Sequence, residues 1–134
     1  LDGGADADTL DGGTGNDTLA GGDGADTLTG GTGTDRFTIA GSDQGADTIT
    51  DFESGSDKIQ IYSPNFGNLA AGGLSSGTFA LAGAETAATR FVFNTATGNL
   101  SYDADGSGAQ VATTIATLTN GRSLTAGDIT VLAG

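Results

Sequence analysis

A nine-residue unit is repeated four times at the start of the chain, and this repeat constrains the fold more than any other feature. The copies are GGADADTLD, GGTGNDTLA, GGDGADTLT and GGTGTDRFT, and they run without interruption from residue 3 to residue 38. Each has the form Gly-Gly-x-Gly-x-Asp-x-U-x with U apolar, except that Asp6 replaces the fourth-position glycine of the first copy. A unit this short cannot bury its apolar residue alone, so successive copies must stack.

Each position of the repeat has a physical role. Glycine adopts positive φ without steric cost, so the glycines predict tight turns whose carbonyl oxygens can approach an ion closely. The apolar eighth position lies in mid-strand, where the pleat points it inward. The turn carboxylates are those of Asp8, Asp17, Asp26 and Asp35, and the inward residues are Leu10, Leu19, Leu28 and Phe37.

One coil of such a structure takes two copies, or eighteen residues. Copies one and three therefore stack on one edge, and copies two and four stack on the other. Stacking predicts that Asp8 and Asp26 share one ion and that Asp17 and Asp35 share another.

The charge and composition favour calcium as that ion. Of the 17 acidic residues, 13 lie in the first 58 positions, where Arg36 and Lys58 are the only basic residues, and the net charge of the chain is −13. Such an array repels itself unless cations neutralise it. The chain has no cysteine and no histidine, which excludes disulfides, thiolate metal sites and the usual zinc sites. Carboxylate and carbonyl oxygens remain, and these suit Ca²⁺ better than a transition metal.

The repeat resembles the calcium-binding nonapeptide of the RTX (repeat-in-toxin, haemolysin-type) family, which implies an all-β fold that begins with a calcium-bound parallel β-roll. In that family one turn offers its first and third carbonyls and the stacked turn offers its second and fourth. The implied carbonyl ligands are Gly3, Ala5, Gly22 and Gly24 for the first ion and Gly12, Thr14, Gly31 and Gly33 for the second, with Gly21, Asp23, Gly30 and Thr32 as further candidates.

Metal is expected to be required for folding of the repeats. Four large apolar side chains are too few to compensate for ordering some 36 residues. We therefore expect residues 1–58 to be disordered without Ca²⁺ and to form a parallel β-roll with it. A flexible Gly/Asp-rich linker is the alternative, but a linker would not keep a nine-residue register with an apolar eighth position.

After Thr38 the repeat decays without stopping. Asp47 and Asp57 still follow the Gly-x-Asp-x-U pattern, and they are expected to close outer calcium sites against Asp26 and Asp35. The stretch DTITDFESGSDKIQI, from residue 47 to residue 61, resembles the end of the β-roll in serralysin-type metalloproteases and alginate epimerase R-modules. Asp51, within it, is either a ligand or the cap of a turn.

Residues 59–134 differ in composition and are predicted to form an antiparallel, β-sandwich-like cap on the roll of residues 1–58. Period-two alternation between Gly, Asn and Ser clusters predicts strands at 59–62, 78–82, 90–94, 99–103, 111–118 and 129–132. The expected core residues are Phe66, Phe79, Phe91, Phe93, Tyr102, Ile115 and Leu118. An open repeat stack needs an end unit of this kind.

The second half also resembles the C-terminal domain of haemolysin-type proteins exported by type I secretion. The resemblance implies an uncleaved export signal near the C-terminus, where residues 128–132 (DITVL) have the acid-then-apolar order. It further implies an upstream domain of the same polypeptide, the type I export machinery as a partner, and a secreted or cell-surface location in a Gram-negative bacterium. Leu1 and Asp2 match positions eight and nine of a preceding copy, which is consistent with a longer array.

Other functions receive less support from the sequence. No base is available to activate a serine, and the carboxylates recur with a structural period, so no enzyme activity is expected. The scarcity of basic residues disfavours nucleic acid as a partner, and no apolar run is long enough to enter a membrane. A surface-layer or adhesin segment that self-assembles with calcium remains an alternative, and a polysaccharide-binding module is a weaker one. Asp103 and Asp105 lie either in a β-hairpin turn or in an isolated calcium site.

Overall fold

The computed structural model describes residues 1–39, 46–53, 55–62, 72–73, 79–81, 91–94, 97–102, 113–119, 124–125 and 128–132. The elements found in these ranges are β-strands. No helix long and apolar enough to cross a membrane occurs in these ranges. The all-β class expected from the sequence is confirmed.

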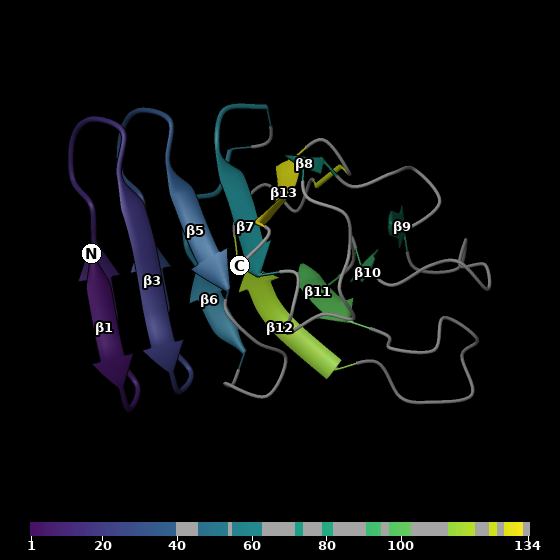
Figure 1. Cartoon of the computed structure of the whole chain (residues 1–134), viewed down its shortest axis with the longest axis horizontal. Coiled ribbons are helices and arrows are strands. Elements are labelled where there is room, and N and C mark those ends of the chain that lie inside the picture. The colour runs from purple at the N-terminus through teal and green to yellow at the C-terminus, as the bar shows by residue number, and fades with distance from the viewer. Residues whose placement is uncertain are drawn as a thin grey trace.

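The strands form two sheets (Figure 1). The first sheet has the order β1 (Asp2–Ala5), β3 (Thr18–Asp23), β5 (Arg36–Ile39), β7 (Lys58–Tyr62), β13 (Ile129–Leu132) and β8 (Gly72–Gly73). The second sheet has the order β2 (Thr9–Asp11), β4 (Thr27–Thr29), β6 (Asp47–Ile49), β12 (Thr113–Leu118), β11 (Asn99–Tyr102), β10 (Phe91–Asn94) and β9 (Phe79–Leu81).

The first seven strands are a parallel β-roll, because the chain alternates between the sheets and each strand pairs in parallel with the next strand but one. Leu19 pairs with Phe37 in the first sheet and Leu10 pairs with Leu28 in the second, so one coil takes eighteen residues as predicted. The next coil is longer: the equivalent residues are 21 apart on one edge and 22 apart on the other.

The six strands predicted in the second half all form, as β7 and β9 to β13, together with β8, which was not predicted. β7 is the last strand of the roll, and the others extend its two sheets. Antiparallel pairing holds for β10 with β11, for β11 with β12 and for β13 with β8. The joins to the roll are parallel, since β12 continues from β6 and β13 continues from β7, and β9 is parallel to β10. Parallel pairing needs a long return connection, and long segments precede β10, β12 and β13.

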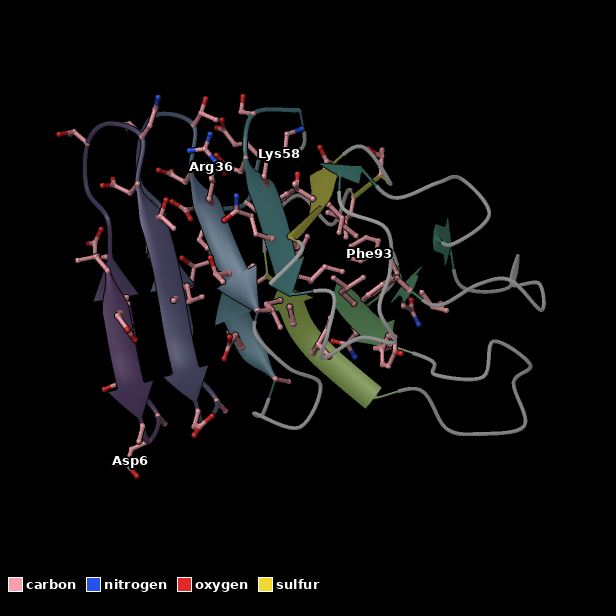
Figure 2. All side chains as sticks on the ribbon, in the orientation of Figure 1. Asp6, Arg36, Lys58 and Phe93 are labelled. Carbon is pink, nitrogen blue, oxygen red and sulfur yellow. The ribbon has the colours of Figure 1, made fainter. Side chains whose placement is uncertain are left out.

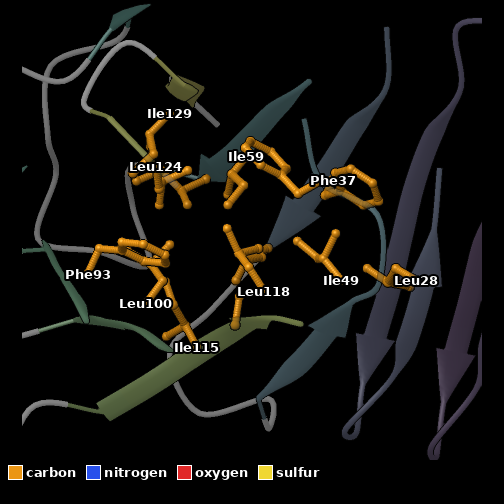
Figure 3. Close-up of a cluster of buried hydrophobic side chains, with 14 of the residues drawn as sticks. Leu28, Phe37, Ile49, Ile59, Phe93, Leu100, Ile115, Leu118, Leu124 and Ile129 are labelled. Carbon is orange, nitrogen blue, oxygen red and sulfur yellow. The ribbon is translucent and has the colours of Figure 1, made fainter. Parts of the chain in front are cut away.

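The hydrophobic core fills the space between the two sheets (Figure 3). In-register pairing of Ile49 with Leu118 and of Ile59 with Ile129 carries the inward apolar positions of the roll into the C-terminal strands. Of the predicted core residues, Phe91, Phe93, Ile115 and Leu118 are fully buried and Tyr102 is partly buried against them. Phe66 lies outside the described residues, as does the side chain of Phe79.

Candidate metal sites

The candidate site residues lie in the turns that connect the two sheets. We call the first edge the row of turns that end in Asp8, Asp26 and Asp47, and the second edge the row that ends in Asp17, Asp35 and Asp57. Each of these aspartates directly precedes, or begins, a strand of the roll. Copies one and three share the first edge and copies two and four share the second, as the eighteen-residue coil requires.

The aspartates of each edge form a ladder of hydrogen bonds. On the first edge, Oδ1 of Asp26 accepts from the backbone N–H of Asp8 at 2.7 Å, and Oδ1 of Asp47 accepts from the N–H of Asp26 at 3.1 Å. On the second edge, Oδ1 of Asp35 and Oδ1 of Asp57 accept from the N–H groups of Asp17 and Asp35, both at 2.9 Å. One carboxylate oxygen of each stacked aspartate thus fixes the spacing of adjacent coils.

In each of the four nonapeptide copies, the Oδ2 atom of the aspartate has no such partner. Among the described residues, the buried side-chain oxygens that accept no hydrogen bond are Oδ2 of Asp8, Asp17, Asp26 and Asp35, one from each nonapeptide copy. The Asp26 and Asp35 side chains are 1% and 0% exposed. A buried carboxylate oxygen without a partner is costly, so this arrangement favours a cation that takes oxygen ligands.

The glycine that opens each copy makes room for that oxygen. A methyl group added at Gly21 would collide with Oδ2 of Asp26, and one added at Gly30 would collide with Oδ2 of Asp35. The same addition at Gly3 or Gly12 would approach Oδ2 of Asp8 or Asp17 to 2.8 and 2.7 Å. The opening position therefore leaves the space beside the carboxylate free of side-chain atoms.

The second glycine of copies three and four is required for both conformation and stacking. Gly22 and Gly31 each have a φ of 95°, which side chains rarely adopt. A side chain at either position would also run into a backbone carbonyl of the preceding coil, that of Gly4 or Gly13. The stacked turns therefore bring backbone oxygens of one coil against the next.

Asp6, which departs from the repeat, adopts the backbone conformation of the glycine that it replaces. Its φ is 79°, and it lies at the tip of the turn after β1 (Figure 2). Aspartate tolerates this region better than most residues, so the turn forms despite the substitution. We expect this turn, in which Asp6 replaces the fourth-position glycine, to be the weakest of the four.

The candidate carbonyl ligands lie in the stacked turns, at the register that stacking requires. On the first edge, the backbone of Gly4 pairs with Gly22 and that of Ala5 pairs with Asp23. On the second edge, Thr14 bridges Thr32, whose carbonyl accepts from Gly15 N–H at 2.9 Å. No group of three or more acidic side chains gathers at one point among the described residues. A metal bound here would take much of its coordination from backbone carbonyls, which suits Ca²⁺.

Asp47 and Asp57, the candidates for outer sites, are 5% and 3% exposed and occupy the third turn of each edge. Burial raises the pKa of Asp47 from 3.8 to about 7, and the nearby Asp26 carboxylate adds to the increase. Asp57 differs from the aspartates of the four nonapeptide copies, because its Oδ2 accepts from the backbone N–H of Glu53 at 2.9 Å.

Two further carboxylates hold backbone amides near the second edge. Asp51 accepts from Gly30 N–H at 2.9 Å and from Gly31 N–H at 2.7 Å, so the structure shows it as the cap of a turn. Asp128 accepts from Gly55 N–H at 2.9 Å, which sequence reasoning did not anticipate because the two residues are 73 positions apart. Asp103 and Asp105 lie outside the described residues.

A known protein family has the same nonapeptide repeat. The family described as the RTX calcium-binding nonapeptide repeat matches residues 2–37, in four copies. No curated protein sequence matches the chain. Among solved structures, the chain is similar to the AlgE6R3 subunit of the mannuronan C5-epimerase from Azotobacter vinelandii, with 21% identity and a TM-score of 0.42, over 95% of this chain and 79% of that chain. The stacked glycine turns and their buried aspartates lie within residues 2–37, the part of the chain that matches the RTX calcium-binding nonapeptide repeat in four copies.

Proposed function

We propose that the chain is a calcium-dependent folding module of a larger secreted protein, in which Ca²⁺ orders the repeats. The observation that carries this proposal is the set of four buried Oδ2 atoms that accept no hydrogen bond, one in each copy. A divalent cation satisfies these oxygens and offsets the repulsion among 13 acidic residues in the first 58 positions. Binding to the folded state alone then stabilises the roll by mass action.

The proposed ligands of each inner site are two stacked carboxylates and the carbonyls around them. On the first edge they are Asp8, Asp26, Gly3, Ala5, Gly22 and Gly24, and on the second edge they are Asp17, Asp35, Gly12, Thr14, Gly31 and Gly33. Asp47 extends the ligand row of the first edge. The buried carboxylates and the register of the stacked turns support this assignment.

We propose that residues 1–58 respond to calcium and that residues 59–134, which we call the apolar platform, cap the roll. β6 and β7 lie against β12 and β13 and share a fully buried core with them. β12 and β13 thus provide the two strands against which the last coil of the roll pairs. We propose that residues 1–134 have a binding and structural role, and that any catalytic activity lies in an upstream domain.

Export by a type I machinery is the proposed cellular context. Residues 128–132, whose acid-then-apolar order suggested a signal, include β13, which lies between β7 and β8 in the first sheet. A strand in that position can be read as a linear signal only before the sheet forms. Low cytoplasmic calcium would keep the repeats unfolded for passage, and extracellular calcium would fold them.

Far-UV circular dichroism in chelator, followed by a calcium titration, tests the proposed function. We expect a largely disordered spectrum that converts cooperatively to β-sheet as calcium is added. A spectrum with complete β-structure in chelator and no change on titration would overturn the proposal. Light scattering on the same samples gives the assembly state: ordered assembly with calcium would instead favour a surface-layer or adhesin segment.

The secretion context needs a separate experiment. We expect removal of residues 128–134 to abolish export of a fused reporter from a host that carries a type I exporter. The matched control replaces Asp128 alone by Asn, which leaves the apolar residues in place. Unimpaired export of the truncated chain would contradict the assignment of the signal.

A further inference from the structure

The third turn of the second edge makes several hydrogen bonds and one aromatic contact with the rest of the protein. We call residues 51–53 and 55–57 the closing turn. Asp51 accepts from the N–H groups of Gly30 and Gly31, both in the calcium-binding turn of copy four. Phe52 is 4% exposed and packs on Phe37, with ring centroids 6.1 Å apart. The closing turn is therefore fixed to the roll by a carboxylate and by an aromatic contact.

Asp57 occupies the ladder position of this turn but uses its second oxygen differently. Its Oδ1 accepts from Asp35 N–H, as the ladder requires. Its Oδ2 accepts from Glu53 N–H at 2.9 Å, within its own turn, whereas Oδ2 of Asp35 is buried and accepts no hydrogen bond. The oxygen that is free for a metal in the nonapeptide copies is thus satisfied by an amide in Asp57.

The C-terminal half secures the same turn from the other side. Asp128, 2% exposed, accepts from Gly55 N–H with Oδ1 and from Thr125 N–H with Oδ2, at 2.9 and 3.0 Å. Glu53 carbonyl also accepts from Asp57 N–H at 2.8 Å, which tightens the turn around Gly55. The contacts run continuously from Asp128 through the closing turn to the backbone of copy four.

We propose that the closing turn binds no ion and that Asp51 and Asp57 are positioning residues, which hold the turn of copy four in its calcium-binding shape. The calcium ladder of the second edge then ends at Asp35. This differs from the outer site that the sequence pattern suggested for Asp35 and Asp57. The inference rests on the proposed calcium sites of the nonapeptide copies, and it assigns to the closing turn the task of linking the apolar platform to the first metal-binding coil.

Counting bound ions in full-length variants tests the assignment. We expect Asp57→Asn to bind as many calcium ions at saturation as the wild type, measured by calorimetric titration. Its half-saturating calcium concentration should rise about tenfold, because one buried charge-assisted hydrogen bond is lost. Asp35→Asn should bind fewer ions, since it removes a ligand. Asp11→Asn, at an exposed position in β2, controls for the loss of one negative charge.

The possible results separate clearly. Fewer ions bound by Asp57→Asn than by the wild type would overturn the proposal, because Asp57 would then be a ligand. Unchanged count and unchanged affinity would overturn its positioning role. If Asp57→Asn does not fold at saturating calcium, the number of bound ions and the calcium affinity are measured for Asp51→Asn instead. Asp51 serves this purpose because it accepts hydrogen bonds from two amides of copy four. A wild-type chain that binds no calcium would instead refute the proposed function on which this inference rests.

Discussion

The repeats and the C-terminal strands share two continuous sheets, but they fill the space between the sheets differently. In the repeats, β2, β3 and β4 each bury a single leucine, such as Leu19 or Leu28. Among the C-terminal strands, β10 buries two apolar residues and β12 buries three, including Phe93 and Leu118 (Figure 3). Apolar burial is therefore larger in β10 and β12 than in β2, β3 and β4.

The polar groups show the opposite distribution. The turns of the repeats contain buried carboxylate oxygens that accept no hydrogen bond, whereas Asp128, which is equally buried, has both oxygens satisfied by backbone amides. One region thus leaves its carboxylates for a ligand, and the other satisfies its carboxylate internally. We therefore expect Ca²⁺ to stabilise the repeats more than the C-terminal strands.

Removal of calcium should produce the largest difference in stability between the repeats and the C-terminal strands. We expect chelator to abolish slow amide exchange in β1 to β4, where the carboxylates would repel one another, and to preserve it in β10, β11 and β12. Hydrogen exchange followed by NMR measures both regions in one sample. Equal loss of protection in the two regions would show that the sheets fold only as one unit.

The two ladder positions of the first edge should differ in the size of their effect. Asp26 receives a hydrogen bond from the coil before it and donates its own N–H to Asp47, whereas Asp8 only donates in this ladder. We expect Asp26→Asn to destabilise the calcium form by about 1.5–3 kcal/mol, as for buried charge-assisted bonds, and Asp8→Asn to cost less. Chemical denaturation in saturating calcium gives both values. Equal losses in the two variants would contradict the stacking scheme.

Local sequence carries the information for the coils, because their contacts repeat at a fixed interval. The eighteen-residue register, the inward leucines and the strand positions of the second half, apart from β8, follow from short patterns. The parallel joins of β12 to β6 and of β13 to β7 do not, since they pair segments about 70 residues apart that share no motif.

The difference between local and long-range contacts also explains which site residues the sequence did not predict. An aspartate at the sixth position of a glycine repeat signals a turn carboxylate by itself. Asp128 carries no such signal, because the amide of Gly55 that it accepts from is reached only through the tertiary fold. For Asp51, the sequence left two roles open, calcium ligand or turn cap. Its hydrogen bonds with the backbone amides of Gly30 and Gly31 are those of a cap.

A smaller effect is expected from pH, through Asp47. Its folded pKa of about 7 exceeds the usual 3.8, so in the absence of metal its contribution to stability is fully present below pH 3.8 and is lost as pH rises through 7. Calcium binding reverses the preference, because a ligating carboxylate must be deprotonated. We expect calcium affinity to weaken as pH falls from 7.5 to 5.5, and Asp47→Asn to flatten this dependence. A pH profile that Asp47→Asn leaves unchanged would assign the proton to another group.

The smallest effect should come from the one irregular turn, and it tests how closely the repeats depend on glycine. Asp6 has a φ of 79°, where a residue with a side chain is strained by about 1–2 kcal/mol relative to glycine, and less for aspartate. Glycine also increases the entropy of the unfolded chain, which offsets about 0.4–1 kcal/mol of that gain. Asp6→Gly should therefore stabilise the calcium form by at most about 1 kcal/mol, seen as a rise of a few degrees in Tm. Asp6→Asn, which removes the charge but keeps a side chain, is the control. If Asp6→Asn gives the same rise, repulsion among the acidic turns, rather than backbone strain, limits the stability of the first coil.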